Sequence, residues 1–264
     1  MKKKALIISI KSFELTPREK LLLAEEKPWG LILFKRNIKS LKKIKKLITD
    51  IRKYAKDRKF PILIDEEGTK VSRLRGIIHN NFNANYFGSL FKLDKKIAIN
   101  LYKNYLKSLS RELKAIGINV NTIPVLDVLR KNTNNIIGNR SFSDNKKIVD
   151  ILGKITVKEC HAQKIISVIK HIPGHGCSDV DSHLKTPRVN LNKKILDKID
   201  FYPFKSNSAK LAMTAHIVYS KIDAKNVSTF SKKIINKIIR KKIKFKGILM
   251  SDDISMKALK YDLI

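Results

Sequence analysis

The chain has 264 residues, with 57 lysines and arginines against 23 aspartates and glutamates, which gives a formal charge of +34 at pH 7. A hydrophobic share of 43% and only 10 glycines and 7 prolines can supply a buried core, which excludes disordered, collagen-like and low-complexity proteins. Lys or Asn interrupts every apolar run before it reaches the roughly 20 residues of a membrane helix, so we expect no membrane contact.

Short apolar runs alternate with segments of helical periodicity along the whole chain. Periodicity of the helical kind is found over residues 41–54, 93–116, 147–163 and 230–243. This alternation predicts an α/β fold with a parallel sheet buried on both faces, and seven strands favour a TIM (β/α)8-type barrel over an open sheet. The predicted strands are residues 5–10, 30–34, 61–66, 118–128, 165–172, 210–217 and 246–253.

Ionisable residues follow five of these strands at their C-terminal ends. In a (β/α)8 barrel this end of the strands carries the active site, whereas the opposite end serves stability. A single aspartate in such a place could be only a helix N-cap. A Lys-His pair and runs of acids are not typical caps, so we expect a functional site. The residues are Asp65 to Glu67, Asp127, Lys170 with His171, His216, and Asp252 with Asp253.

Residues 170–183 hold the densest cluster of candidate functional groups. A proline and two glycines predict a loop that leaves the fifth strand. A metal site is one interpretation of its histidines and aspartates, but a loop does not provide the helix face that His-x3-His ligands need, so we expect no metal. In the other interpretation, Asp181 orients His183, which then transfers protons. A loop histidine held by Asp181 for structural reasons alone remains a third interpretation.

Asp252 lies at the end of the last apolar run, where a partly buried carboxylate can attack an electrophilic carbon. Retaining glycosidases combine a nucleophilic carboxylate with an acid/base group across an oxocarbenium-like transition state. Asp252 and His183 are the candidates for these two roles.

The net charge and the cysteines bear on partners and location. The lysines are scattered among Ile and Asn over the whole chain and form no patch, which is typical of an AT-rich coding bias. Specific binding of nucleic acid is therefore the less favoured alternative, although attraction to polyanions is expected at low salt. Cys160 and Cys177 cannot make a disulfide framework, and the apolar run at 5–10 is too short for a secretion signal, so we expect a cytoplasmic protein.

Several motifs together resemble one known family. They are KHIPGHG at 170–176 with DSH at 181–183, SDDISM at 251–256, and shorter matches at 30–37, 65–68, 124–127, 138–142 and 213–216. The chain resembles glycoside hydrolase family 3 over almost its whole length, and within that family it is similar to the bacterial cytoplasmic β-N-acetylglucosaminidases of cell-wall recycling.

The resemblance implies a retaining exo-β-N-acetylglucosaminidase that removes terminal N-acetylglucosamine from anhydro-muropeptides in peptidoglycan recycling, through a covalent glycosyl-enzyme. It implies that Asp252 is the nucleophile and that His183, assisted by Asp181, is the acid/base. It also implies no metal or cofactor, and we expect a monomer whose partner is the small-molecule substrate. The resemblance assigns binding of the sugar to Asp65, Arg73, Arg140, Lys170 and His171.

Two departures from the family pattern carry expectations of their own. The family usually has Gly-Arg where this chain has Thr69-Lys70, which predicts strain at Thr69. The sequence ends at Ile264, so the resemblance predicts a barrel lacking its eighth βα unit, as one family 3 N-terminal domain over residues 1–264 that is incomplete at its C-terminus. A fragment, a decaying gene or a partner chain would each account for this, and a catalytically impaired relic is the alternative function.

Overall fold

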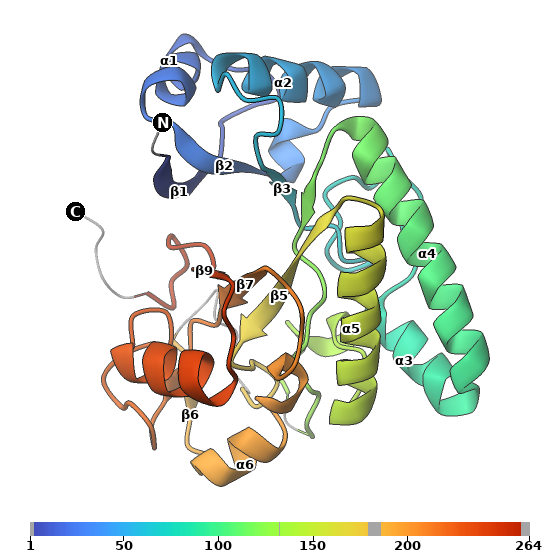
Figure 1. Ribbon diagram of the computed structural model, residues 1–264, viewed down its shortest axis with the longest axis vertical. Helices are drawn as coiled ribbons and strands as arrows, with labels where there is room; N and C mark the ends of the chain where they lie inside the picture. Colours follow the sequence, from blue (N-terminus) through green and yellow to red (C-terminus); the bar gives the residue numbers. More distant parts are fainter. Residues whose placement is uncertain (1–2, 132, 179–185, 260–264) are drawn as a thin grey trace.

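The seven apolar runs of the sequence form one parallel sheet in the computed structural model, which describes residues 3–131, 133–178 and 186–259 (Figure 1). The order of the strands in the sheet follows their order in the chain, as the alternating pattern predicts. The strands are β1 (Lys4–Ile8), β2 (Pro28–Leu33), β3 (Ile62–Ile64), β4 (Val120–Asn121), β5 (Ile166–Ile172), β7 (Leu211–Thr214) and β9 (Ile248–Met250).

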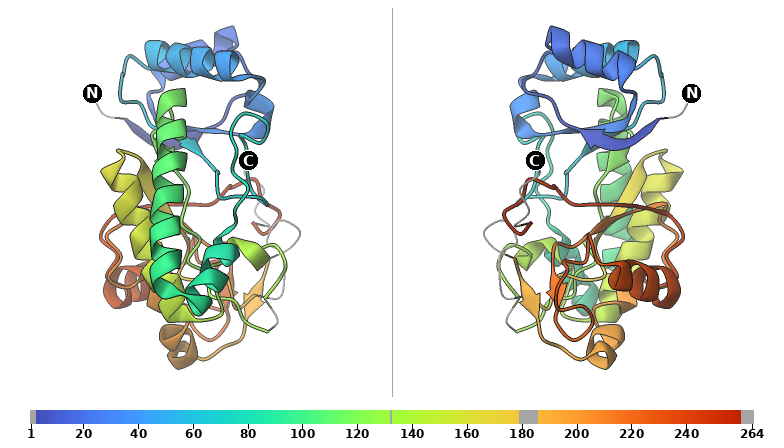
Figure 2. Two further views of the ribbon diagram at one scale, coloured as in Figure 1. Left: turned by 90° about the vertical axis from the view of Figure 1, so that its right-hand side faces the viewer. Right: turned by 90° about the vertical axis from the view of Figure 1, so that its left-hand side faces the viewer.

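Helices connect the strands and cover the outer face of the sheet. Figures 1 and 2 show α1 and α2 beside β1 and β2, while α4 and α5 run side by side along the middle strands. In the described ranges, no helix combines the length and the apolar character that crossing a membrane requires. The helices are α1 (Pro17–Glu25), α2 (Leu41–Tyr54), α3 (Ala84–Leu93), α4 (Lys95–Ile116), α5 (Lys146–Ala162), α6 (Lys193–Lys198) and a π-helix (Ile234–Lys242).

The helix ends follow the local sequence. Thr16 caps α1 by accepting from the backbone N–H of Glu19, and the Glu19 side chain accepts in return from the N–H of Thr16. Asp94 caps the first turn of α4, and Gly117 ends that helix with a φ of 105°, a conformation that glycine adopts most easily. The strand and helix pattern of the sequence did not predict α1, α3 and α6, although the Thr-Pro-x-Glu capping signature of α1 is visible in it.

Two apolar clusters lie on the two faces of the sheet. On β3, Ile62 and Ile64 pack in the large cluster that includes residues of α2, whereas Leu63 between them packs in a smaller cluster. The smaller cluster gathers residues from β1 through β9, so the sheet must curl around it. Its buried members are Leu63, Val120, Val168, Leu211 and Met213, with Ile7, Trp29, Ile32 and Met250 packed against them.

β1 and β9 are the two ends of this curled sheet. In residues 3–131, 133–178 and 186–259 no backbone pairing joins them, and Leu6 and Ile248 are 53% and 55% exposed. The curled parallel sheet with outer helices confirms the barrel type of α/β fold. The absence of an eighth βα unit stays a prediction.

Some predicted segments differ in length from the observed elements. Within the predicted strand 118–128 only Val120 and Asn121 form a ladder, as β4; Pro124 has no N–H to donate, and beyond it the pairing with β5 resumes as a single bridge between Val125 and Lys170. Residues 218–219, next to the predicted strand 210–217, form β8 (Val218–Tyr219) instead, which pairs in parallel with β6 (Arg188–Val189) in a separate two-stranded ribbon.

Candidate active site

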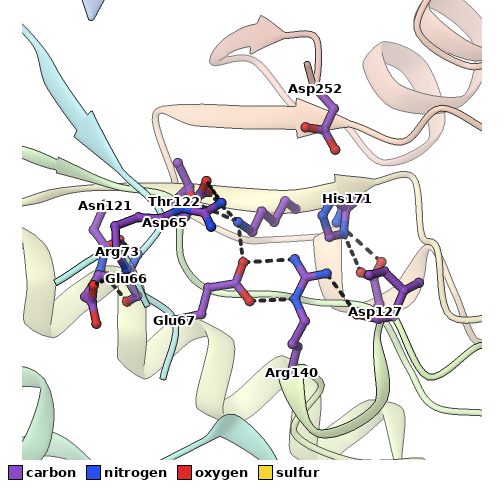
Figure 3. A network of polar contacts seen from close by, with 12 residues as sticks. Asp65, Glu66, Glu67, Arg73, Asn121, Thr122, Asp127, Arg140, His171 and Asp252 are labelled. Carbon is purple, nitrogen blue, oxygen red and sulfur yellow. Dashed lines mark hydrogen bonds and ion pairs between the residues drawn. The ribbon is translucent and has the colours of Figure 1, made fainter. Parts of the chain in front are cut away.

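Ionisable side chains from several strands meet at the C-terminal end of the sheet (Figure 3). They come from the segments after β3, β4, β7 and β9, and from the last residues of β5. The predicted sugar-binding residues Asp65, Arg73, Arg140, Lys170 and His171 all lie in this network or in direct contact with it.

Glu66 fixes the loop after β3. Its side chain is fully buried, and one carboxylate oxygen accepts from the backbone N–H groups of Arg73 and Leu74, each at 3.0 Å. The other oxygen accepts from Nδ2 of Asn80 at 2.7 Å. These bonds fold the loop back on itself and bring Arg73 to the site, so Glu66 shapes the loop. Its two acidic neighbours, Asp65 and Glu67, face the mouth of the sheet, which is the C-terminal end where the ionisable side chains meet.

Asp65 is held by two cations and a hydroxyl. Its Oδ2 accepts from Nη2 of Arg73 at 3.0 Å, and its Oδ1 lies 3.1 Å from Nζ of Lys170 and accepts from the hydroxyl of Thr122. Burial alone would raise the pKa of Asp65, but the charges of Lys170 and Arg73 outweigh it and hold that pKa below its usual value. Asp65 is therefore an ionised acceptor.

Glu67 contacts Lys170 as well, together with a third cation, Arg140. Nε and Nη2 of Arg140 donate to its two oxygens at 2.7 and 2.9 Å, and Nζ of Lys170 lies 2.5 Å from Oε1. Burial would raise the pKa of Glu67, but Arg140 and Lys170 lower it to about 2. The same contacts raise the pKa of Lys170 against the effect of its burial.

The cluster has an excess of donors. Three cations, Lys170, Arg140 and Arg73, face two carboxylates, Asp65 and Glu67, so it keeps one positive charge. Lys170 directs its ammonium group to Asp65, Glu67 and Thr122. Such an arrangement suits a polyhydroxylated ligand, because the carboxylates accept from hydroxyls and the cations donate to them.

Strand β5 is irregular at His171, the residue after Lys170. The pairing of β5 with β7 shifts between Lys170 and Ile172, so His171 is an extra residue on β5. Successive residues of a regular strand point to opposite faces, whereas this bulge lets both side chains reach the strand ends. Nδ1 of His171 lies 2.6 Å from Oδ2 of Asp127, a fully buried carboxylate after β4.

His216 holds the segment that follows β9. Its Nε2 lies 3.1 Å from the carbonyl oxygen of Asp253, which can only accept, so Nε2 carries a proton and donates it. Nδ1 lies 2.7 Å from the hydroxyl of Thr229. Burial lowers the pKa of His216, although the charge of Asp252 opposes this, so the ring is neutral at pH 7.

Asp252 and Asp253 have different environments. The carboxylate of Asp253 accepts from the backbone N–H and the hydroxyl of Ser255, as in a capping turn. Asp252 is half-buried, and its Oδ1 accepts from the N–H of Asp253 at 2.8 Å. Figure 3 shows its carboxylate directed toward the side where His171 lies. Of the two acids, Asp252 is the one that faces the mouth.

The predicted acid/base pair, His183 and Asp181, lies outside the described residues. The segment before it is closely packed, since a Cβ atom on Gly176 would lie 1.9 Å from the carbonyl oxygen of Val128. The hydroxyl of Tyr219 donates to the carbonyl oxygen of Gly174. No group of three His, Cys, Asp or Glu side chains that could hold a metal ion occurs in the part of the chain that the structure describes.

The expected strain at Thr69 is not observed. Thr69 is not among the residues with positive φ, whereas Gly68 has a φ of 141°, and a Cβ atom there would lie 2.2 Å from the carbonyl oxygen of Phe82. The unusual conformation of this turn thus falls on the residue before Thr69. Lys70 donates to the carbonyl oxygen of Asn135 and does not take part in the cluster.

Four contributors to the site had no role in the sequence-based assignment. Glu67, Asp127 and His216 lie at strand ends and in motifs that carry the resemblance, at 65–68, 124–127 and 213–216, but these patterns assign them no role. Their positions are visible in the pattern, but the contacts that join them to Lys170, His171 and Asp253 span 37 to 103 residues of sequence, which the pattern does not reveal. The four residues are Glu67, Thr122, Asp127 and His216.

Comparisons with known proteins agree with this arrangement. A family model described as the Glycosyl hydrolase family 3 N terminal domain matches residues 4–262. A protein named Beta-hexosaminidase from Stenotrophomonas maltophilia (strain R551-3) is 32% identical over 259 residues, which cover 96% of this chain and 75% of that protein. A Beta-hexosaminidase from Idiomarina loihiensis is 34% identical over 255 residues, with coverage of 95% and 75%.

Among solved structures, NagZ from Neisseria gonorrhoeae in complex with N-trifluoroacetyl-D-glucosamine matches with a TM-score of 0.88 and 31% identity. The match covers 96% of this chain and 75% of that one. These relatives therefore extend beyond the part that this chain matches.

Proposed function

The chain belongs to glycosyl hydrolase family 3, and from this premise we propose that it is a retaining exo-β-N-acetylglucosaminidase with its active site at the C-terminal end of the sheet. The observation that carries the proposal is the carboxylate of Asp252, which faces the mouth where a buried cluster of carboxylates and cations offers contacts to a sugar. The names of the relatives support a hexosaminide as substrate.

In the proposed binding step, the terminal N-acetylglucosamine lies against the cluster. Asp65 accepts hydrogen bonds from its hydroxyls, while Arg73, Arg140 and Lys170 donate to its oxygens and His171 contacts it through Nε2. Because the ion pairs exist before the sugar arrives, these side chains lose little conformational freedom on binding.

In the proposed chemistry, a carboxylate oxygen of Asp252 attacks the anomeric carbon while protonated His183, assisted by Asp181, gives its proton to the leaving glycosidic oxygen. The bond between that oxygen and the anomeric carbon breaks, and a glycosyl-enzyme ester forms. Neutral His183 then takes a proton from water, whose oxygen attacks the anomeric carbon and releases Asp252. Two inversions give net retention.

For the natural substrate we propose anhydro-muropeptides, cleaved in the cytoplasm during peptidoglycan recycling by a monomer in which residues 1–264 form one domain. The net charge of +34 attracts substrates that carry lactyl or peptide carboxylates. Cys160 and Cys177 are free thiols, which suits a reducing compartment.

The test is hydrolysis of 4-nitrophenyl N-acetyl-β-D-glucosaminide, followed by proton NMR of the first sugar released. We expect turnover, with the β-anomer appearing first and the α-anomer only by later mutarotation. The assay is repeated on a chimera that adds the unmatched part of the Stenotrophomonas relative. The α-anomer first would contradict retention, and no turnover in either protein would contradict the proposed activity.

A further inference from the structure

Asp127 is a buried carboxylate whose hydrogen bonds, within the described residues, go to His171 at the end of β5 and to His175 in the segment that follows it. Its Oδ1 accepts from the backbone N–H groups of His171 at 3.3 Å and His175 at 2.6 Å. Its Oδ2 lies 2.6 Å from Nδ1 of His171, and the side chain has no exposed surface. One carboxylate thus holds the backbone of this segment and the ring of a proposed sugar-binding residue.

The ionised state of Asp127 determines which ring nitrogen of His171 carries a proton. Burial would raise the pKa of Asp127, but the neighbouring His171 outweighs this and lowers it, so the carboxylate is ionised at pH 7. An ionised carboxylate can only accept, so the contact of 2.6 Å requires a proton on Nδ1 of His171. Nε2 is then the nitrogen that is available to a ligand. Figure 3 shows Asp127 and Asp252 on opposite sides of the His171 ring in this view.

We propose that Asp127 is a positioning residue that fixes the proton of His171 on Nδ1 and thereby presents Nε2 to the bound sugar. The role in sugar binding rests on the proposed function, whereas the placement of the proton does not. A purely structural Asp127 would need only to accept from the two backbone N–H groups, which the amide oxygen of an asparagine could also do.

Asp127→Asn separates these two roles. The amide oxygen of the new side chain can still accept from the N–H groups of His171 and His175, but its NH2 group must donate to Nδ1 of His171. The variant therefore moves the ring proton to Nε2 without removing the backbone contacts. Asp200→Asn is the matched control, because Asp200 is also fully buried, lies against Gly174 of the same segment and binds Arg130 instead of an imidazole.

Long-range ¹H–¹⁵N NMR of the histidine rings reads the position of the proton directly, with the His171 signals identified by their loss in His171→Ala. We expect Nδ1 to be protonated in the wild type and in Asp200→Asn, and unprotonated in Asp127→Asn. Unprotonated Nδ1 in the wild type would overturn the proposal, and so would an unchanged Nδ1 signal in Asp127→Asn. The wild-type spectrum tests the proposal even if the variant does not fold.

The functional consequence is tested with a double-mutant cycle. In the wild-type background Asp127→Asn should lower kcat/KM for the aryl N-acetylglucosaminide by about 10- to 100-fold, mainly through KM, as the loss of one well-formed hydrogen bond predicts. In the His171→Ala background it should change kcat/KM less than about 2-fold. Equal losses in both backgrounds would show a structural role that does not act through His171. The NMR result needs no turnover, so failure of the glycosidase proposal is recognised separately.

Discussion

The two sides of the candidate site are built differently. On one side, Glu67 and Lys170 are buried and joined by short ionic contacts, and β3 is buried between β2 and β4. On the other side, Asp252 is half-buried at the end of β9, a strand of three residues that pairs with β7 and whose first residue, Ile248, is 55% exposed.

This difference assigns sugar binding to one side of the site and the attack on the sugar to the other side. The buried cluster is ordered before a ligand arrives, because its charges would be costly to bury without their partners. A nucleophile has to stay accessible to the anomeric carbon, and Asp252 is only half-buried. We therefore expect changes on the binding side to affect folding and binding together, and changes at Asp252 to affect turnover alone.

The largest expected effect is on turnover. Asp252→Ala should reduce kcat for an aryl N-acetylglucosaminide by on the order of 10⁴-fold or more, as removal of a covalent catalyst does. The melting temperature should stay close to that of the wild type, because the side chain is half-buried and, within the described residues, its carboxylate accepts from the N–H of the next residue and forms no ion pair. A large loss of thermal stability would mean that Asp252 is part of the packed structure, and the contrast between the two sides would fail.

The largest expected effect on stability comes from the opposite side. Glu67→Ala leaves Lys170 and Arg140 buried without one of their carboxylates, which should lower the free energy of unfolding by about 3–5 kcal/mol in a denaturant titration. Asp50→Ala is the matched control, since it breaks the exposed Lys46–Asp50 pair on α2 and should change stability little. Similar losses in the two variants would contradict the special role of the buried cluster.

A low pH should lower the free energy of unfolding through the buried cluster around Glu67. The pKa of Glu67 is about 2 in the folded chain against a usual value of 4.5, so the unfolded chain takes up this proton first as the pH falls. The stabilisation is complete above about pH 5 and is lost as the pH falls toward 2. Denaturant titrations across this window should show a shallower pH dependence for Glu67→Gln than for the wild type. Parallel curves would mean that Glu67 is not the titrating group.

The smallest effect is expected at the neighbour of the nucleophile. Asp253→Ala removes the acceptor for the N–H and hydroxyl groups of Ser255, on an exposed turn. We expect a loss of about 0.5 kcal/mol in stability and a change in kcat of less than about 3-fold. If this variant lost as much activity as Asp252→Ala, the assignment of the nucleophile to one of the two acids would be wrong.

The strands and the placement of the site could be predicted because both depend on local patterns. β3 and β5 are apolar runs, and Asp65 and Lys170 lie at their C-terminal ends, where parallel strands bring polar residues together. The orientation of His171 could not be predicted, because it depends on a register shift between β5 and β7. The partners of Glu67 could not be predicted either, since Arg140 follows it by 73 residues in the sequence.

The most direct test of the central claim is to trap the covalent intermediate. An activated 5-fluoro glycosyl fluoride of N-acetylglucosamine destabilises the oxocarbenium-like transition states, so a glycosyl-enzyme accumulates when its formation is faster than its hydrolysis. Mass spectrometry of the tryptic peptide 247–257, which contains Asp252 and Asp253, should then show one added sugar on Asp252. An adduct on another residue, or turnover of the reagent by an active enzyme with an inverted product, would contradict the account.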